Sequence, residues 1–467
     1  MRAYMDDNFL LETKTAETLY HQYAAEMPII DYHTHFNPAQ IMNNMQVENI
    51  TQAWLRGDHY KWRLMLTMGV EEKFITGDAS DWEKFYNFAR ILPKCIGNPV
   101  HHWAHMELRR YFDCSLIINA DTAQEIWNMT EKLLQQDSLS ARSILKTMKV
   151  KMIGTTDDAT SDLRWHKALR EDKSNPVVVA PSFRPDKIVN IEIEGFAKQI
   201  EELAKRSGRS IDSVDTLKAA LLECIQFFDE MGCKASDHGM EYMVFRKADP
   251  KTIEAIFQKG ISGDSLSEEE VEAYKTDLMM FLGREFSKRG WVMQLHYCAM
   301  RNINKRMFGL LGPGSGYDTI NPRECARALA EFLSALDEEH ALPKTIVFSL
   351  NPNDNPIIDS IVGSFQEAGI VGKVQHGMAW WYNDAKVGIE NHLHSFAELG
   401  ALGSFVGMLT DSVSFFSFPR HEYFRRILCN VIGSMVERGE YPNDINALGE
   451  IVQDISYHNA ARYFGID

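Results

Sequence analysis

The sequence has little positive charge and no long apolar stretch. Lys and Arg number 49 against 65 Asp and Glu, so the formal net charge is −16 at pH 7. A nucleic-acid partner or an anionic membrane surface calls for clustered basic charge, and we therefore expect neither. No run approaches the roughly 20 apolar residues needed to span a bilayer. An anionic ligand would have to be met by locally placed cationic side chains.

Cysteine is also scarce and forms no recognisable pattern. The seven cysteines are scattered, and no two form a C-x-x-C pair. An odd number without such a pair is typical of free, mostly buried thiols in the reducing cytoplasm. The first twelve residues contain no basic segment followed by an apolar one, so we expect no secretory signal. These features predict a cytoplasmic protein.

A histidine pair stands at the end of the first predicted strand. Residues 28–36 read PIIDYHTHF, and the apolar run between Pro28 and Pro38 indicates a short buried strand. Side chains at positions i and i+2 share one face of a strand, so His33 and His35 point the same way. Two neutral imidazoles on one face suit a divalent metal ion.

Strand candidates recur along the rest of the chain. They lie at residues 152–156, 177–183, 233–238, 291–296, 345–350, 374–376 and 405–411. Amphipathic or capped helical patterns separate them. Eight strands that alternate with helices predict an α/β fold of the (β/α)8 barrel type, and an open doubly wound sheet is the alternative.

The first and second strands lie far apart in the sequence. The intervening residues are rich in Trp, Met, Tyr and charge, with helical spacing at 81–89 and 122–134. We interpret them as a mainly helical insertion. The predicted organisation is an N-terminal helix and first strand at 1–39, the insertion at 40–145, and the remainder of the barrel at 146–467.

Polar residues end several of the predicted strands, and in a barrel those ends carry the active site. His33, His35, His296 and Asp411 would supply three nitrogens and a carboxylate to one divalent ion and leave positions open. Asp31 could orient this set from behind. The fourth strand ends in Ser-Asp-His and offers no lysine that could bridge a second metal.

Short blocks of sequence, in order along nearly the whole chain, carry a resemblance to a known family. They are DYHTH at 31–35, GDHYKWR at 57–63, TGDAS at 76–80, GTTDD at 154–158, RPDK at 184–187, SDH at 236–238, WW at 380–381, GMLTD at 407–411 and RHEYFRR at 420–426. In these blocks the chain resembles the amidohydrolase superfamily and, within it, the uronate (glucuronate) isomerase family.

The resemblance implies an intramolecular oxidoreductase. The expected reaction is the metal-assisted aldose–ketose isomerisation of D-glucuronate to D-fructuronate, and of D-galacturonate to D-tagaturonate, through an enediol in hexuronate breakdown. One divalent ion, zinc or manganese, is expected, with His33, His35 and Asp411 as its surest ligands. The expected partner is a small uronate, with assembly into a homo-oligomer left open.

The resemblance also assigns roles around the substrate. Proton transfer is expected from Asp411, His59 or Tyr60, among which the sequence does not choose. Arg184 and Arg301 are expected near the substrate, where a planar guanidinium suits the uronate carboxylate. Trp380 or Trp381 is expected to form a wall of the site.

One position departs from the family pattern. The family has Thr-Asp-Ser-Arg-Ser after the eighth strand, whereas residues 410–414 read TDSVS. Val413 thus replaces an arginine expected to face the substrate, although the nearby Arg420 could take over its role. The alternatives to an active isomerase are a metal-dependent hydrolase or decarboxylase of the same superfamily, a catalytically impaired paralogue, and a barrel that only binds its ligand.

Overall fold

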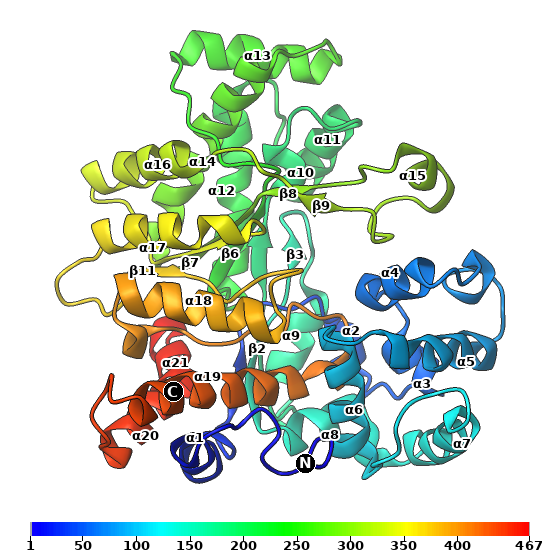
Figure 1. The fold of residues 1–467 in the computed structure, drawn as a ribbon. Helices are drawn as coiled ribbons and strands as arrows, with labels where there is room; N and C mark the ends of the chain where they lie inside the picture. The colour runs from blue at the N-terminus through cyan, green and yellow to red at the C-terminus, as the bar shows by residue number, and fades with distance from the viewer. Residues whose placement is uncertain (1, 467) are drawn as a thin grey trace.

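Parallel strands form the centre of the computed structural model, which describes residues 2–466 (Figure 1). One sheet has the order β1-β2-β4, and a second has the order β11-β10-β7-β6-β5-β3. The strands are β1 (Ile29–Asp31), β2 (Val150–Gly154), β3 (Asp157–Asp158), β4 (Val178–Ala180), β5 (Ser182–Arg184), β6 (Ala235–Gly239), β7 (Val292–Tyr297), β10 (Thr345–Ser349) and β11 (Val374–His376). The α/β class predicted from the sequence is confirmed.

The chain itself joins the two sheets. Strand β2 runs on into β3, and β4 runs on into β5 past Pro181. At this break the Thr155 N–H donates to Ala180 O at 3.0 Å, and the Ser182 N–H donates to Thr155 O at 3.0 Å. Each of these two predicted strands is therefore one extended segment whose halves pair in different sheets.

The segment predicted as the eighth strand, residues 405–411, is not a strand in the structure. Gly407 has a φ of 79°, which interrupts regular pairing. The Thr410 N–H donates to the side chain of Asp31 at 2.9 Å rather than to a neighbouring strand, and the Asp411 N–H donates to His33 O at 3.2 Å. Within residues 2–466 no ladder joins this segment to β11, so backbone pairing does not close a barrel.

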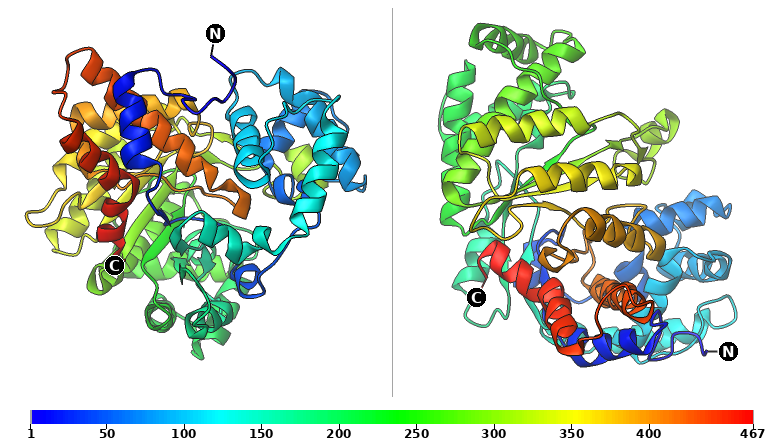
Figure 2. Two further views of the ribbon diagram at one scale, coloured as in Figure 1. Left: turned by 90° about the horizontal axis from the view of Figure 1, so that it is seen from below. Right: turned by 60° about the vertical axis from the view of Figure 1, so that its left-hand side comes forward.

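Helices surround the strands, as the view from below shows (Figure 2, left). Those after β3 are α9 (Arg164–Glu171), α10 (Asp186–Val189), α11 (Phe196–Ser207), α12 (Val214–Glu230), α13 (Pro250–Ser262), α14 (Glu268–Arg289), α15 (Lys305–Leu311), α16 (Ala326–Glu338), α17 (Asn355–Ser364), α18 (Lys386–Leu399), α19 (Pro419–Glu437), α20 (Ile445–Gln453) and α21 (Asn459–Phe464). The short hairpin β8 (Ala299–Met300) and β9 (Thr319–Ile320) flanks α15. The capping box of Ser267 and Glu270 starts α14, as the sequence indicated.

The chain between β1 and β2 is helical and gathers to one side of the strands (Figure 1). Its helices are α2 (Pro38–Met42), α3 (Ile50–Trp54), α4 (His59–Thr67), α5 (Asp81–Ile91), α6 (Pro99–Phe112), α7 (Ala123–Leu134) and α8 (Ala141–Thr147). Helix α1 (Lys14–Leu19) precedes β1. The division of the chain into residues 1–39, 40–145 and 146–467 stays a proposal. None of the helices in the described part of the chain has the length and apolar character needed to cross a membrane.

Helix α4 is fastened to the connection between β7 and α16. The guanidinium of Arg63 donates to Gly316 O at 2.7 Å and to Asp318 O at 3.0 Å. At the start of the helix, Asp58 accepts from the Lys61 N–H at 3.2 Å and pairs with the buried Lys61 ammonium at 2.5 Å. These contacts bring the first turn of α4 over the carboxyl ends of the strands.

Candidate active site

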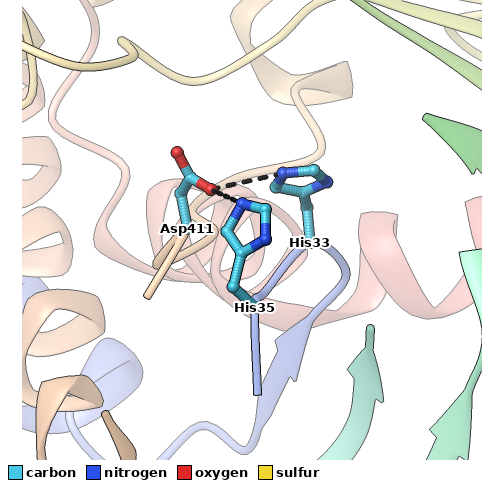
Figure 3. Close-up of side chains that lie close together, drawn as sticks. All are labelled: His33, His35 and Asp411. Carbon is cyan, nitrogen blue, oxygen red and sulfur yellow. Dashed lines mark ion pairs between the residues drawn. The ribbon is translucent and has the colours of Figure 1, made fainter. Parts of the chain in front are cut away.

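Two histidines and an aspartate converge where β1 ends (Figure 3). The Nε2 atoms of His33 and His35 lie 3.3 and 3.0 Å from Asp411 Oδ1. One ligand atom from each of the three residues lies within 4.8 Å of the other two. Two imidazole nitrogens and a carboxylate oxygen around one point are a donor set that fits a divalent cation.

Asp411 is held so that only one of its oxygens faces the histidines. Its Oδ2 accepts the indole N–H of Trp380 at 2.8 Å and that of Trp381 at 2.7 Å. The residue has a φ of 47°, a left-handed conformation that is uncommon outside glycine and clusters at functional sites. The two tryptophans thus orient the carboxylate, a role that the sequence did not indicate.

The charge of Asp411 follows from its neighbours. Burial raises the pKa of the carboxyl, but the adjacent imidazoles of His33 and His35 outweigh burial and hold the pKa well below its ordinary value. Asp411 is therefore ionised at neutral pH, as a metal ligand must be. Asp31 accepts from both the N–H and the hydroxyl of Thr410, at 2.9 and 2.7 Å, and so fixes the residue that precedes Asp411.

His296 belongs to a second group, which it forms with Asp237 and His33. Its Nδ1 lies 2.9 Å from Asp237 Oδ1, while the guanidinium of Arg184 lies 3.1 Å from Asp237 Oδ2. Burial lowers the pKa of His296 to about 4, so its ring is neutral. His33 is common to this group and to the group with His35 and Asp411, and the place of His296 among the metal ligands stays a prediction.

Two adjoining cavities contain the side chains that the sequence singled out. The first, of about 480 Å³, is lined by His33, His35, Arg184, His296, Arg301, Trp380, Trp381 and Asp411. The second, of about 230 Å³, is lined by His59, Tyr60 and Val413, and it shares His35, Arg301, Trp381 and Asp411 with the first. The first volume lies in the range of small-molecule sites. Every predicted site residue therefore faces one cavity or the other.

His59 and Tyr60 enter the site from the first turn of α4. Their rings stack with centroids 5.1 Å apart, and His59 meets Trp381 edge to face at 4.9 Å. Burial lowers the pKa of His59, so its ring is neutral near pH 7. Burial raises the pKa of the Tyr60 phenol well above its ordinary value, so the phenol keeps its proton.

The two candidate arginines sit in different surroundings. Arg184 forms ion pairs with Asp186, at 2.7 Å, and with Asp237. Arg301 pairs with Asp318 at 3.1 Å, and its guanidinium lies 4.3 Å from the ring centroid of Trp381. Both guanidiniums line the first cavity, and their binding of an anion stays a prediction.

Val413 forms an apolar wall of the second cavity and is 43% exposed. A Cβ placed on Gly57 would lie 3.5 Å from the valine Cγ2, so the two residues face each other closely. Arg420 also lines this second cavity, so a guanidinium is present there, and its taking over the role of the missing arginine stays a prediction. Arg420 is buried, lies over Trp103 with 4.1 Å between guanidinium and ring centroid, and donates to Thr410 O at 3.2 Å.

Restoring an arginine at this position should speed turnover. Valine cannot donate a hydrogen bond, so any substrate oxygen that faces it goes unpaired. We expect Val413→Arg to raise kcat/KM on D-glucuronate about tenfold, which corresponds to about 1.4 kcal/mol. Val413→Met, which adds length without charge, is the matched control. Equal or lower kcat/KM in a folded Val413→Arg protein would show that the site works without this guanidinium.

Sequence reasoning missed several polar residues of the site. Asp186 and Asp318 pair with the two arginines, and Asp384 accepts a hydrogen bond from the Tyr60 hydroxyl at 2.8 Å. Asp186 stands two residues after Arg184, and Asp384 stands three residues after Trp381. Asp186 also lies within the RPDK block that carries the resemblance, whereas Asp318 had no signal in the sequence.

Comparisons with known proteins identify the family of this chain. A family model described as glucuronate isomerase matches residues 1–464. The uronate isomerases of Lachnospira eligens and Caldicellulosiruptor bescii are 50% and 51% identical to the chain, and each match covers 100% of both sequences. The crystal structure of uronate isomerase from Thermotoga maritima superimposes with a TM-score of 0.94 at 34% identity, covering 99% of this chain and 100% of that one. The chain belongs to the glucuronate isomerase family.

Proposed function

We propose that this protein is a metal-assisted uronate isomerase. It interconverts D-glucuronate with D-fructuronate and D-galacturonate with D-tagaturonate through an enediol, as a step of hexuronate breakdown. The observation that carries the proposal is the meeting of the His33, His35 and Asp411 donor set with two guanidiniums in one cavity. The seven buried, unpaired cysteines favour the cytoplasm as its compartment.

The metal and the substrate carboxylate have separate binding groups. A divalent ion, zinc or manganese, held by His33, His35 and Asp411 would polarise the carbonyl and hydroxyl oxygens and stabilise the charge that develops on them. Trp380 and Trp381 keep Asp411 turned toward that position. Arg184 or Arg301 binds the carboxylate at the far end of the sugar.

Isomerisation must take a proton from C2, beside the aldehyde, and return one to C1. Asp411, His59 and Tyr60 line the second cavity together and are the groups that we propose for this transfer. The neutral His59 can accept a proton, and the Tyr60 phenol stays protonated because burial raises its pKa. Trp54 and Trp381 line the same cavity.

The test is turnover of the purified chain on defined substrates. D-glucuronate and D-galacturonate, assayed with each divalent metal, should give D-fructuronate and D-tagaturonate. A panel of amides and lactones, run in parallel, examines the alternative of a metal-dependent hydrolase. Hydrolysis of the panel without isomerisation would overturn the proposal, and binding of uronates without turnover would indicate an impaired paralogue.

A further inference from the structure

Asp384 lies behind Tyr60, in the connection between β11 and α18. The Tyr60 hydroxyl donates to Asp384 Oδ2 at 2.8 Å, and the other carboxylate oxygen is buried without a hydrogen-bond partner among the described residues. Burial raises the pKa of Asp384 to about 6, against the opposing charge of Arg420. A carboxylate with these properties is poised to take up a proton near neutral pH.

The backbone next to Asp384 is rigidly placed. The side-chain amide of Asn383 donates to Leu350 O at 2.9 Å, which ties the connection to the end of β10. Gly388 packs so closely that an added Cβ would lie only 2.0 Å from Asn383 O. On the other side, Asp58 caps α4 and fixes the turn that carries Tyr60. The Tyr60–Asp384 hydrogen bond thus joins two turns that are each held by a further hydrogen bond.

An aldose–ketose isomerisation relocates two hydrogens. One moves from C2 to C1, and the other must leave the O2 hydroxyl while a proton is added to O1. The Tyr60 phenol has one hydrogen, and that hydrogen already points at Asp384. The phenol oxygen is therefore free to accept a proton from the cavity that Tyr60 lines.

We propose that Asp384 is a positioning residue that acts through Tyr60 in moving the oxygen-bound proton, an inference that rests on the proposed function. The O2–H bond of the substrate breaks and its proton goes to the Tyr60 oxygen, while the phenol proton goes to Asp384 Oδ2. The return runs in reverse, with the Tyr60 oxygen giving a proton to O1. The protons balance, and no oxidant or reductant is involved.

The substitution Asp384→Asn separates positioning from proton uptake. The asparagine amide oxygen still accepts the Tyr60 hydrogen bond, but it does not take up a proton at neutral pH. We expect kcat to fall about tenfold with KM changed less than twofold. Asp384→Glu, which keeps the carboxyl group, should recover part of kcat. Asp229→Asn is the control, since Asp229 also accepts a hydrogen bond, from the Trp291 indole at 2.9 Å, but lies outside both cavities.

A double-mutant cycle with Tyr60→Phe tests whether Asp384 acts through Tyr60. Once the phenol is absent, Asp384→Asn should cause no further loss of kcat. Circular dichroism and metal content report whether each variant is folded and loaded.

Three results would overturn the inference. They are full kcat in folded Asp384→Asn, equal activity of the Glu and Asn variants, and a loss of kcat that persists unchanged in the Tyr60→Phe background. If Asp384→Asn does not fold, the comparison of Asp384→Glu with wild type in the two Tyr60 backgrounds decides by the same criterion. A wild-type chain inactive on uronates would overturn the proposed function as well, whereas the three results leave that function standing.

Discussion

His33→Asn should lose most of its bound metal and lower kcat/KM on uronates about a thousandfold. His33 is buried, and its Nε2 faces Asp411 at 3.3 Å, so the amide would remove one of the three donors around the metal position. A metal that stabilises developing charge contributes several kcal/mol, and about 4 kcal/mol corresponds to a thousandfold change in rate. Metal per chain and kcat/KM should be measured on the same preparations.

The matched control is His105→Asn. His105 is equally buried, but it lies in α6, where it bonds to His101 O at 2.6 Å and accepts the Ile118 N–H at 3.0 Å. This variant should keep its metal and its turnover if it folds. Full metal occupancy and normal turnover in His33→Asn would place the metal elsewhere in the protein.

Replacing the arginine that binds the uronate carboxylate should lower kcat/KM about ten- to a hundredfold. A hydrogen bond to a charged group contributes about 1.5–3 kcal/mol, which sets this range. Arg184→Met and Arg301→Met keep a long apolar side chain and remove the guanidinium. The effect should fall on uronates and spare D-glucose, an aldose without the carboxylate, so the ratio of the two activities is the measurement.

Arg323→Met controls for the substitution itself. Arg323 pairs with Glu268 and Glu272 and lies over Tyr242, outside the two cavities. Arg184 also holds Asp237, so the melting temperature and metal content of Arg184→Met must accompany its kinetics. Unchanged uronate turnover in both cavity variants would mean that other groups bind the carboxylate.

Local sequence signals predicted most of the fold because many elements here follow local rules. The helical spacing at 81–89 lies within α5, and the capping box of Ser267 and Glu270 begins α14. The segment at 405–411 has the sequence pattern of a strand but does not form one, because its hydrogen-bond partners lie far away in the sequence. The Asp31 carboxylate accepts a hydrogen bond from the Thr410 N–H, 379 positions away in the sequence, and no local sequence pattern can predict such a contact.

The candidate site, too, has a part that the sequence predicted and a part that it did not. Strand periodicity places His33 and His35 on one face, and the polar end of the predicted eighth strand grouped Asp411 with them before the resemblance named it a ligand. Neither could show that two indoles orient Asp411 by hydrogen bonds. Nor could they show that Asp237 pairs with both His296 and Arg184, or that Asp384 accepts a hydrogen bond from Tyr60. Those arrangements depend on side-chain directions at the meeting point of separate loops, which are set only when the whole chain has packed.

The fastening of α4 has a consequence for the order of folding. Arg63 meets Gly316 across 253 positions of the chain, and this contact carries His59 and Tyr60 into the site. Contacts between residues so far apart form late, because closing the long intervening segment costs conformational entropy. During refolding from denaturant, helix content and the burial of tryptophan should therefore recover before turnover does. The time at which catalysis returns marks the docking of this helix.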